Sequence, residues 1–228
     1  MKSPWDSVAQ KFNTFKKRPY AGAMDNVLTV WPIAKQYIRS HLKTRSGKRA
    51  LEYGCGTGNF CVELSKLGFQ TTGIDSSPRM VKLGKKFVSK NIELLIGDYK
   101  TAAANRRRKG KFIFICGIMV FQFVADIKNC FKWLSQTLET GGHIFFAVHD
   151  PKILRARNIK NKLKLAGMDK AVPVFPRKAR EYDQIFKKLK LKKILEKHID
   201  YHPKFKQQYG RELGKNTPKY MILGYKKI

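Results

Sequence analysis

The chain has 228 residues, of which 43% are apolar and 12% aromatic, enough for one buried core, and this composition excludes an intrinsically disordered protein. It carries 48 Lys and Arg against 16 Asp and Glu, a formal net charge of +32. The N-terminal MKSPWDSVAQKF lacks the apolar core of a signal peptide, and the longest apolar run, 112–121, is too short to span a bilayer. We therefore expect a cytoplasmic protein without an integral membrane segment.

The positive charge is spread unevenly along the chain. Residues 51–100 hold seven basic and five acidic side chains, whereas residues 151–200 hold sixteen against five and residues 1–50 hold eleven against two. Such a basic protein attracts acidic partners at long range, and the charge says nothing about its fold.

The cysteines show no pattern of a disulfide framework or a metal site. A C-x-x-C pair and zinc-ligand spacing are both missing from the sequence, and a reducing compartment would keep the side chains as thiols. We expect buried thiols and no metal. The four residues are Cys55, Cys61, Cys116 and Cys130.

Two helices are predicted at the start of the chain, at 4–15 and 25–42, separated by KKRPYAGA. Short apolar runs then alternate with amphipathic segments, which is typical of a parallel sheet covered by helices on both faces. The runs interpreted as strands are RALEY (49–53), TTGID (71–75), IELLIG (92–97), KFIFIC (111–116) and HIFFAV (143–148).

Local signals fix two of the helix ends. Ser77 can cap the helix after the second strand, and Pro78 suits its first position. Gly141 and Gly142 are expected to form a tight turn between a helix at 126–138 and the strand that follows.

The chain changes character after the fifth predicted strand. A basic stretch with several prolines extends to about residue 178, and within it LRARNIKNKLKL (154–165) is predicted to be helical. A helix at 179–189 and strands near 194 and at 220–225 follow. No repeat or linker divides the chain, so we expect a single domain over residues 1–228.

The stretch LEYGCGTGNF places Gly54, Gly56 and Gly58 directly after a predicted strand. Residues without a β-carbon let backbone N–H groups approach a ligand at a helix N-terminus. The dinucleotide fingerprint G-x-G-x-x-G would need glycine where Asn59 stands, which disfavours a dehydrogenase. Asp75 follows Gly54 by 21 residues at the end of the second strand, where a carboxylate can bind both hydroxyls of a ribose.

With these motifs the chain resembles the class I S-adenosylmethionine-dependent methyltransferases of the small-molecule type. The resemblance extends over about residues 50–148 in order and spacing, and LGYKK (223–227) is similar to the last strand of the family. It implies a Rossmann-like α/β fold, with a seven-stranded mostly parallel sheet, helices on both faces and an antiparallel seventh strand. It also implies S-adenosyl-L-methionine as cofactor and S-adenosyl-L-homocysteine as product.

The resemblance implies a set of cofactor-binding residues from four motifs, LEYGCGTGNF, GIDSSPRM, GDY and ICGIMVFQFVAD. Glu52 would serve the amino group of the methionine moiety, Asp75 the ribose, and Asp98 the adenine amino group. The remaining members are Gly54, Cys55, Gly56 and Gly58 in the loop, Ser76 and Met80 beside the adenosine, Tyr99 on the adenine ring, and Cys116 and Gly117 under the cofactor. In this reading residues 1–48 are a helical cover, 49–150 the cofactor-binding core, and 151–228 the acceptor-side segment with the last two strands.

Several of these residues also have ordinary structural interpretations. Taken singly, Asp75 and Asp98 would be strand-end or turn residues, and Met80 and Tyr99 could belong to the core or the surface. Their occurrence together with the glycine loop is what favours cofactor binding.

The acceptor side departs from the family pattern. Ile113 follows Phe112 where many members carry Asp, and Gln122 stands where His is frequent, so a catalytic role of that His does not carry over. Gln122 remains a substrate-side candidate, and Tyr20 is a second one that would close over the site as part of a lid, on the resemblance alone.

His149 is the candidate general base. Open α/β sheets bind ligands outside the carboxyl ends of their strands, and His149 is the one of the five histidines at such a position. A base is needed if the acceptor is a hydroxyl or an ammonium. The alternative is a structural His at a strand-to-loop junction before Pro151.

Three functions remain open for a protein with these motifs. The first is in-line methyl transfer to an O or N atom of a small, anionic or carrier-bound metabolite, because residues 151–178 hold nine basic side chains and one acidic one. The second is methylation of RNA or another nucleic acid, supported by the net charge and the run RRRKGK (106–111), although the fourth motif reads CGIM and not the N-P-P-Y of base-modifying enzymes. The third is a non-catalytic protein that binds the cofactor.

Overall fold

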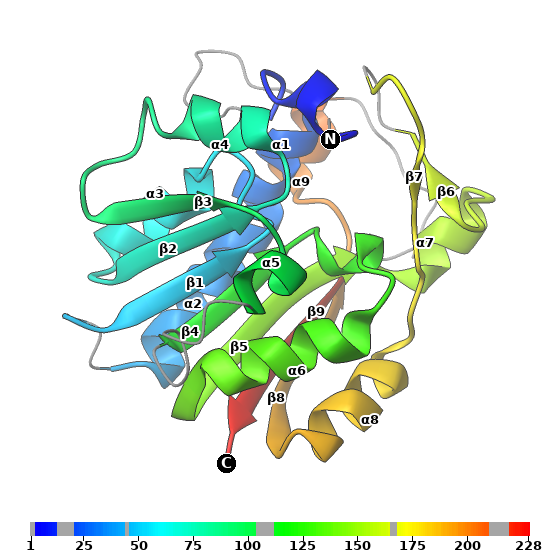
Figure 1. Ribbon diagram of the computed structural model, residues 1–228. Coiled ribbons are helices and arrows are strands. Elements are labelled where there is room, and N and C mark those ends of the chain that lie inside the picture. Colours follow the sequence, from blue (N-terminus) through cyan, green and yellow to red (C-terminus); the bar gives the residue numbers. More distant parts are fainter. Residues whose placement is uncertain (1–2, 13–20, 44–45, 104–111, 165–167, 210–218) are drawn as a thin grey trace.

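The computed structural model describes residues 3–12, 21–43, 46–103, 112–164, 168–209 and 219–228 (Figure 1). Two of the features singled out above, Tyr20 and the run at 106–111, lie outside the described residues.

A seven-stranded sheet forms the centre of the molecule, in the order β3-β2-β1-β4-β5-β9-β8 (Figure 1). Neighbouring strands are parallel except at β9, which runs antiparallel to both β5 and β8. The predicted Rossmann-like sheet with an antiparallel seventh strand is therefore confirmed. The strands are β1 (Arg49–Tyr53), β2 (Gln70–Asp75), β3 (Ile92–Ile96), β4 (Phe112–Ile118), β5 (Leu138–His149), β8 (Leu191–Ile199) and β9 (Tyr220–Lys227).

Strand order reverses beside β1, which pairs with β2 on one side and β4 on the other. The connections leaving β1 and β4 therefore diverge and open a crevice at the carboxyl end of the sheet. The glycine loop follows β1 and lies at this crevice.

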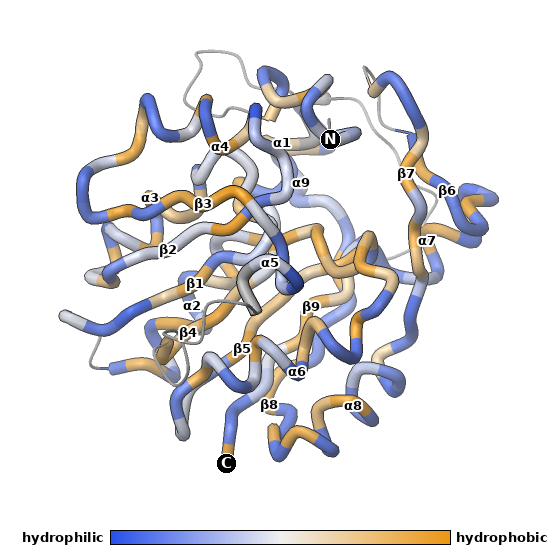
Figure 2. The backbone as a smooth tube through the Cα atoms, viewed as in Figure 1, coloured by the Kyte–Doolittle hydropathy of each residue, from blue (hydrophilic) through white to orange (hydrophobic). Residues whose placement is uncertain are grey.

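Helices cover both faces of the sheet, as predicted. The helices α6 (Ile127–Thr137) and α8 (Ala179–Lys188) pack on one face, and α2 (Trp31–His41) and α3 (Asn59–Lys66) pack on the other. Alternate strand residues point to opposite faces, so Leu51 joins the first core and Ala50 the second. Figure 2 shows the hydrophobic residues gathered along the central strands.

Side-chain caps support the sequence-based helix boundaries. Ser77 Oγ accepts a hydrogen bond from the Met80 N–H at 3.1 Å and caps α4 (Pro78–Gly84). Asp126 likewise accepts from the Asn129 N–H at 3.2 Å at the start of α6. The remaining elements are the turns η1 (Asp6–Val8), η2 (Asn26–Val30) and η4 (Phe121–Phe123), the helices α1 (Ala21–Asp25), α5 (Tyr99–Ala103), α7 (Pro151–Ala156) and α9 (Pro203–Tyr209), and the short strands β6 (Lys162–Leu163) and β7 (Val172–Pro173).

The N-terminal predictions need correction. In the described part of 4–15 the chain forms only the 3-10 turn η1, because the Asp6 carboxylate is engaged with the start of α4, where it accepts from Ser77 Oγ and the Arg79 N–H. The helix predicted at 25–42 is interrupted by the π-helical turn η2, which precedes Pro32. A proline lacks the N–H that a continuous helix would use at that point.

Two further predictions differ from the structure. Gly141 and Gly142 lie inside β5 at an irregularity of its pairing with β4, since α6 runs directly into the strand. The helix predicted at 154–165 ends at Ala156, because Asn158 takes a left-handed conformation with φ of 52° and the chain then enters β6. The helix α9 was not predicted. No helix in the described ranges combines the length and apolar character needed to cross a bilayer.

Candidate active site

A cavity of about 420 Å³ opens at the crevice beside β1. Its lining comes from the loop after β1, the end of β2, the start of α5 and the connection between β4 and α6, with a cover from the N-terminal segments. The cover residues are Trp5, Phe12, Ala23, Asn26 and Trp31.

The glycine loop after β1 needs residues without a β-carbon. Gly54, Gly56 and Gly58 have φ values of 72°, 55° and 76°, which disfavour other residues. A β-carbon on Gly54 would lie 2.4 Å from the Val120 side chain, whereas one on Gly56 would meet no atom closer than the Met80 sulfur at 3.9 Å. The loop therefore presents bare backbone at Gly56 to the cavity, and this cradle fits a ligand that approaches the main chain.

Asp75 is held rigidly at the end of β2. Its Oδ2 accepts from the Gly56 N–H and its Oδ1 from the Ser77 N–H, both at 2.8 Å. Burial raises the pKa of Asp75, and these two backbone hydrogen bonds oppose the rise. Because a carboxylate oxygen can accept more than one hydrogen bond, Asp75 can still accept from a ligand in the cavity that it lines.

Glu52 lies on β1 with 4% of its surface exposed, and it lines the cavity. Its Oε2 accepts from the Cys61 thiol at 3.0 Å. Burial raises the pKa of Glu52 to about 8. A cationic group brought next to this carboxyl would favour its ionised form, so the position suits an ammonium.

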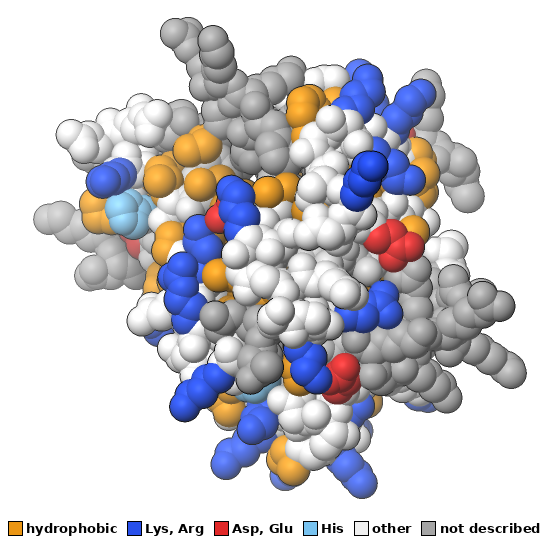
Figure 3. Space-filling model, turned by 90° about the vertical axis from the view of Figure 1, so that its left-hand side faces the viewer, with side chains coloured by type: hydrophobic (Ala, Val, Ile, Leu, Met, Phe, Trp, Pro, Cys, Tyr) orange, Lys and Arg blue, Asp and Glu red, His pale blue; other side chains and the backbone are white. Residues whose placement is uncertain are grey.

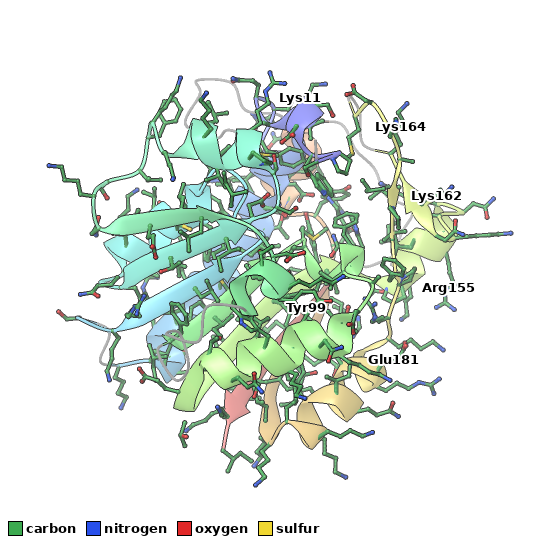
Figure 4. All side chains as sticks on the ribbon, in the orientation of Figure 1. Lys11, Tyr99, Arg155, Lys162, Lys164 and Glu181 are labelled. Atoms are coloured by element: carbon green, nitrogen blue, oxygen red, sulfur yellow. The ribbon has the colours of Figure 1, made fainter. Side chains whose placement is uncertain are left out.

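Asp98 lies between β3 and α5, and Tyr99 is the first residue of α5 (Figure 4 labels Tyr99). Asp98 Oδ1 accepts from the N–H groups of Lys100 and Thr101 at 2.9 and 3.1 Å, so this carboxylate caps α5. The Tyr99 N–H donates to the Tyr53 hydroxyl at 3.3 Å. Both the capping role and a ligand role are compatible with this geometry, because both residues line the cavity.

The structure brings most of the predicted cofactor residues together. Those that line the cavity are Glu52, Gly54, Cys55, Gly56, Asp75, Ser76, Met80, Asp98 and Tyr99.

Three predicted residues do not line it. Gly58 caps α3 and packs against Leu94, Cys116 is fully buried in the core, and Gly117 faces the Phe121 ring, which a β-carbon would approach to 2.5 Å. These three lie behind the lining of the cavity. Cofactor binding by the whole set stays a prediction.

Sequence reasoning expected a cover from residues 1–48 but singled out none of Trp5, Phe12 and Asn59 as site residues. Asn59 Nδ2 donates to the Phe12 carbonyl at 2.8 Å and to Thr57 Oγ1 at 2.9 Å, while its buried Oδ1 has no partner in the described part of the chain. Trp5 and Phe12 carry no motif, since aromatic residues near an N-terminus are common. Asn59 was noted only as a break in the dinucleotide fingerprint.

A second cavity of about 130 Å³ adjoins the first. Gln122 and His149, the two acceptor-side candidates that the structure describes, both line this smaller cavity and not the larger one. The residues that line both cavities are Trp5, Phe12, Asn26, Met119 and Phe123.

His149 stands at the end of β5, as expected from the sequence. Burial lowers the pKa of His149 to about 4, and the positive charge of Arg157 adds to the shift. The imidazole is therefore neutral near pH 7 and can accept a hydrogen bond, while the lowered pKa makes it a weaker base than an exposed histidine. Its buried Nδ1 has no hydrogen-bond partner among the described residues.

The cysteines and the possible metal ligands were also considered in the sequence. Each of the four cysteines is buried as a free thiol. Within the described ranges no three His, Cys, Asp or Glu side chains come together in a way that could hold a metal ion.

Comparison with known proteins adds three findings. A family model described as "Methyltransferase domain" matches residues 28–198. The chain is 25% identical over 196 residues to a ubiquinone biosynthesis O-methyltransferase of Coxiella burnetii, covering 80% of each chain, and 29% identical over 120 residues to the protein of that name from Nitrosococcus oceani. The second match spans about half of each chain, 51% of this one and 49% of the relative.

The fold is also found in solved structures. An S-adenosylmethionine-dependent methyltransferase from Mesorhizobium loti superposes with a TM-score of 0.68 at 16% identity, over 84% of this chain and 96% of that one. At this identity the likeness shows a common fold.

Proposed function

The chain belongs to the class I S-adenosylmethionine-dependent methyltransferases, and from this premise we propose that it methylates an oxygen or nitrogen atom of a small, anionic acceptor. The observation that carries the proposal is the pair of adjoining cavities, one with a glycine cradle and carboxylates and one with the neutral His149. The cofactor of the family is S-adenosyl-L-methionine, and S-adenosyl-L-homocysteine remains after transfer.

In the larger cavity three carboxylates would hold the cofactor. Glu52 would bind the ammonium of the methionine moiety, Asp75 the ribose hydroxyls and Asp98 the adenine amino group. When bound, the cofactor supplies a methyl group already activated by a sulfonium. The protein therefore has to orient the two reactants, a contribution that can reach about 7–11 kcal/mol.

His149 would serve the acceptor. A neutral imidazole with an unpartnered buried Nδ1 can accept a hydrogen bond from a hydroxyl or ammonium group in the smaller cavity and so orient it for transfer. The name of the two relatives, ubiquinone biosynthesis O-methyltransferase, favours oxygen as the acceptor atom.

The anionic character of the acceptor is inferred from the charge beside the smaller cavity. Arg157 lines this cavity and is itself exposed. Figure 4 shows Arg155, Lys162 and Lys164 on the neighbouring α7, β6 and the residue after it, with side chains directed outward. A carboxylate, a phosphate or an acidic carrier would be attracted to this side of the molecule.

Nucleic acid is the second candidate acceptor, because the net charge is +32. The face seen in Figure 3 carries many Lys and Arg side chains and few Asp and Glu side chains. Binding that depends on phosphates would weaken steeply between about 50 and 200 mM salt. Binding inside an enclosed cavity would change far less.

We also propose that the chain is one domain and acts in the cytoplasm, which rests on its composition and on a single sheet whose strands come from residues 49–227.

The test is transfer of isotope-labelled methyl from S-adenosyl-L-methionine into a cell extract, followed by separation into small molecules, protein and nucleic acid. Label in the small-molecule fraction that disappears with Asp75→Ala supports the proposal. The matched control is Asp169→Ala, which removes an exposed carboxylate outside both cavities and should leave the label unchanged. Label in the nucleic-acid fraction would replace the proposed acceptor class by the second candidate.

A further inference from the structure

The smaller cavity gathers unpartnered polar atoms. Four buried side-chain polar atoms have no hydrogen-bond partner in the described part of the chain. Three of them, Gln122 Oε1, His149 Nδ1 and the Tyr201 hydroxyl, belong to residues that line the smaller cavity, and the fourth, Asn59 Oδ1, belongs to the larger one. Buried polar groups are nearly always paired in folded proteins, so this concentration points to a ligand.

We propose that the smaller cavity binds a single aromatic ring carrying hydroxyl groups, recognised by Gln122, His149 and Tyr201. The inference rests on the proposed function, since this ring would be the part of the acceptor that is methylated.

The size of the cavity supports one ring. A dry apolar cavity of about 150 Å³ in another protein holds benzene, and the smaller cavity here measures about 130 Å³. A fused ring system would not fit within this volume.

The walls suit an aromatic ligand. Apolar side chains from the N-terminal segment, η4, α7, β6 and β9 surround the space. Trp5 and Phe123 meet edge to face with ring centroids 4.9 Å apart, so an aromatic ring can add to an existing cluster. The wall residues are Trp5, Phe123, Ile153, Leu154, Leu163 and Tyr220.

The unpartnered polar atoms of the smaller cavity require a ligand with hydrogen-bond donors. Gln122 is 2% exposed, and its Nε2 already donates to the Met119 carbonyl at 3.0 Å, which leaves Oε1 as an acceptor. His149 is neutral, and its Nδ1 accepts when the proton is on Nε2. Two hydrogen-bond acceptors and one hydroxyl match a ring with hydroxyl groups better than a ring without donors.

Tyr201 is positioned for recognition by its own packing. Its ring stacks on the Phe205 ring with centroids 5.0 Å apart, and Lys219 Nζ lies 3.9 Å from the centroid of the Tyr201 ring. Both Tyr201 and Lys219 line the smaller cavity. Asp25 accepts a hydrogen bond from the Lys219 ammonium, so this cation is already paired and does not offer a free anion site. Tyr201 lies beyond residues 28–198, which the family model matches, so the role proposed for it does not come from that match.

Arg157 is the cation left at the edge of the cavity, and no acidic side chain of the described residues pairs with it. A carboxylate on the ring would find its partner there.

The test is equilibrium binding to the protein saturated with S-adenosyl-L-homocysteine, measured by calorimetry. The probes are 3,4-dihydroxybenzoate, its 3,4-dimethoxy analogue, which has the ring and the carboxylate but no donors, and naphthalene-2-carboxylate. We expect the dihydroxy compound to bind at least tenfold more tightly than either of the others.

Tyr201→Phe and Gln122→Leu should each weaken binding of 3,4-dihydroxybenzoate about fivefold or more without changing the affinity for S-adenosyl-L-homocysteine. The matched control is Tyr225→Phe, which removes a hydroxyl bonded to Asp183, outside both cavities, and should bind both ligands as the wild type does. Equal affinity for the dihydroxy and dimethoxy compounds, or unchanged binding in both cavity variants, would overturn the inference. No binding of S-adenosyl-L-homocysteine to the wild type would instead contradict the proposed function.

Discussion

The larger and the smaller cavity differ in how the chain builds them. The motif residues of the larger cavity lie between 52 and 126 and follow parallel strands in order, whereas the smaller one takes residues from the N-terminal segment, α7, the segment after β8 and the start of β9. Local charge differs in the same way, because residues 51–100 are nearly balanced and residues 151–200 are strongly basic.

The difference is one of physical cause. The cradle of the larger cavity depends on backbone geometry. Its positive φ values favour glycine, and the Gly56 N–H donates to Asp75. Side-chain packing alone makes the smaller cavity, and many sequences can provide such packing. Substitutions in the cradle and in the smaller cavity should therefore act in different ways.

The largest effect is expected from Gly54→Ala. A β-carbon there would meet Val120 at 2.4 Å in a backbone conformation with φ of 72°, and we expect a loss of about 2–5 kcal/mol in the free energy of unfolding. The matched variant Gly141→Ala has a similar φ of 76° with open space around it, and should cost about 1–2 kcal/mol. Urea unfolding measures both. Equal losses would show that the close approach to Val120 is unimportant.

His149 provides a pH test of the smaller cavity. Its pKa is about 4 in the folded protein and near 6.5 when exposed, so the unfolded chain binds the extra proton between these values. The wild type should lose about 3 kcal/mol of stability from this group as pH falls from 7 to 4.

His149→Gln should lack that loss, so the difference in unfolding free energy between wild type and variant should shrink as pH falls from 7 to 4. Other groups with shifted pKa, among them His143, are present in both proteins and cancel in this difference. A difference that does not change with pH would contradict the burial of a neutral imidazole.

Asp75→Ala tests the larger cavity at its most ordered carboxylate. Loss of charge-assisted hydrogen bonds should weaken the affinity for S-adenosyl-L-homocysteine by about tenfold to a hundredfold. The exposed Asp169→Ala serves again as the control. Retained affinity in Asp75→Ala would remove this residue from the proposed ribose site.

Glu52 should make the affinity of the larger cavity depend on pH. Its pKa of about 8 in the free protein should drop when an ammonium binds beside it, so binding releases a proton. The affinity for S-adenosyl-L-homocysteine should therefore rise about tenfold at most per unit as pH increases from 6 towards 8. Calorimetry in two buffers with different heats of ionisation measures the released proton, and Glu52→Gln should abolish the release.

Much of the larger cavity and its sheet could be predicted from the sequence. The alternation of apolar runs located the strands β1 to β5, and Ser77 with Pro78 located the start of α4. These signals are local: a strand pattern, a cap or a glycine depends on neighbours within a few residues.

The failures occur where distant contacts decide the local structure. The segment at 4–12 follows a helical pattern, but the engagement of Asp6 with α4 gives it a 3-10 turn instead. Residues 154–165 also follow one, but the left-handed Asn158 ends the helix early and β6 then pairs with β7.

The sequence by itself determined the parallel sheet, the glycine loop and the carboxylates at the strand ends, because each is specified by residues close together in the chain. The tertiary structure alone decided that Trp5, Phe123, His149 and Tyr201 surround one small cavity. Side chains from four separate segments meet there only after the sheet has assembled, and no local pattern in the sequence encodes such a meeting.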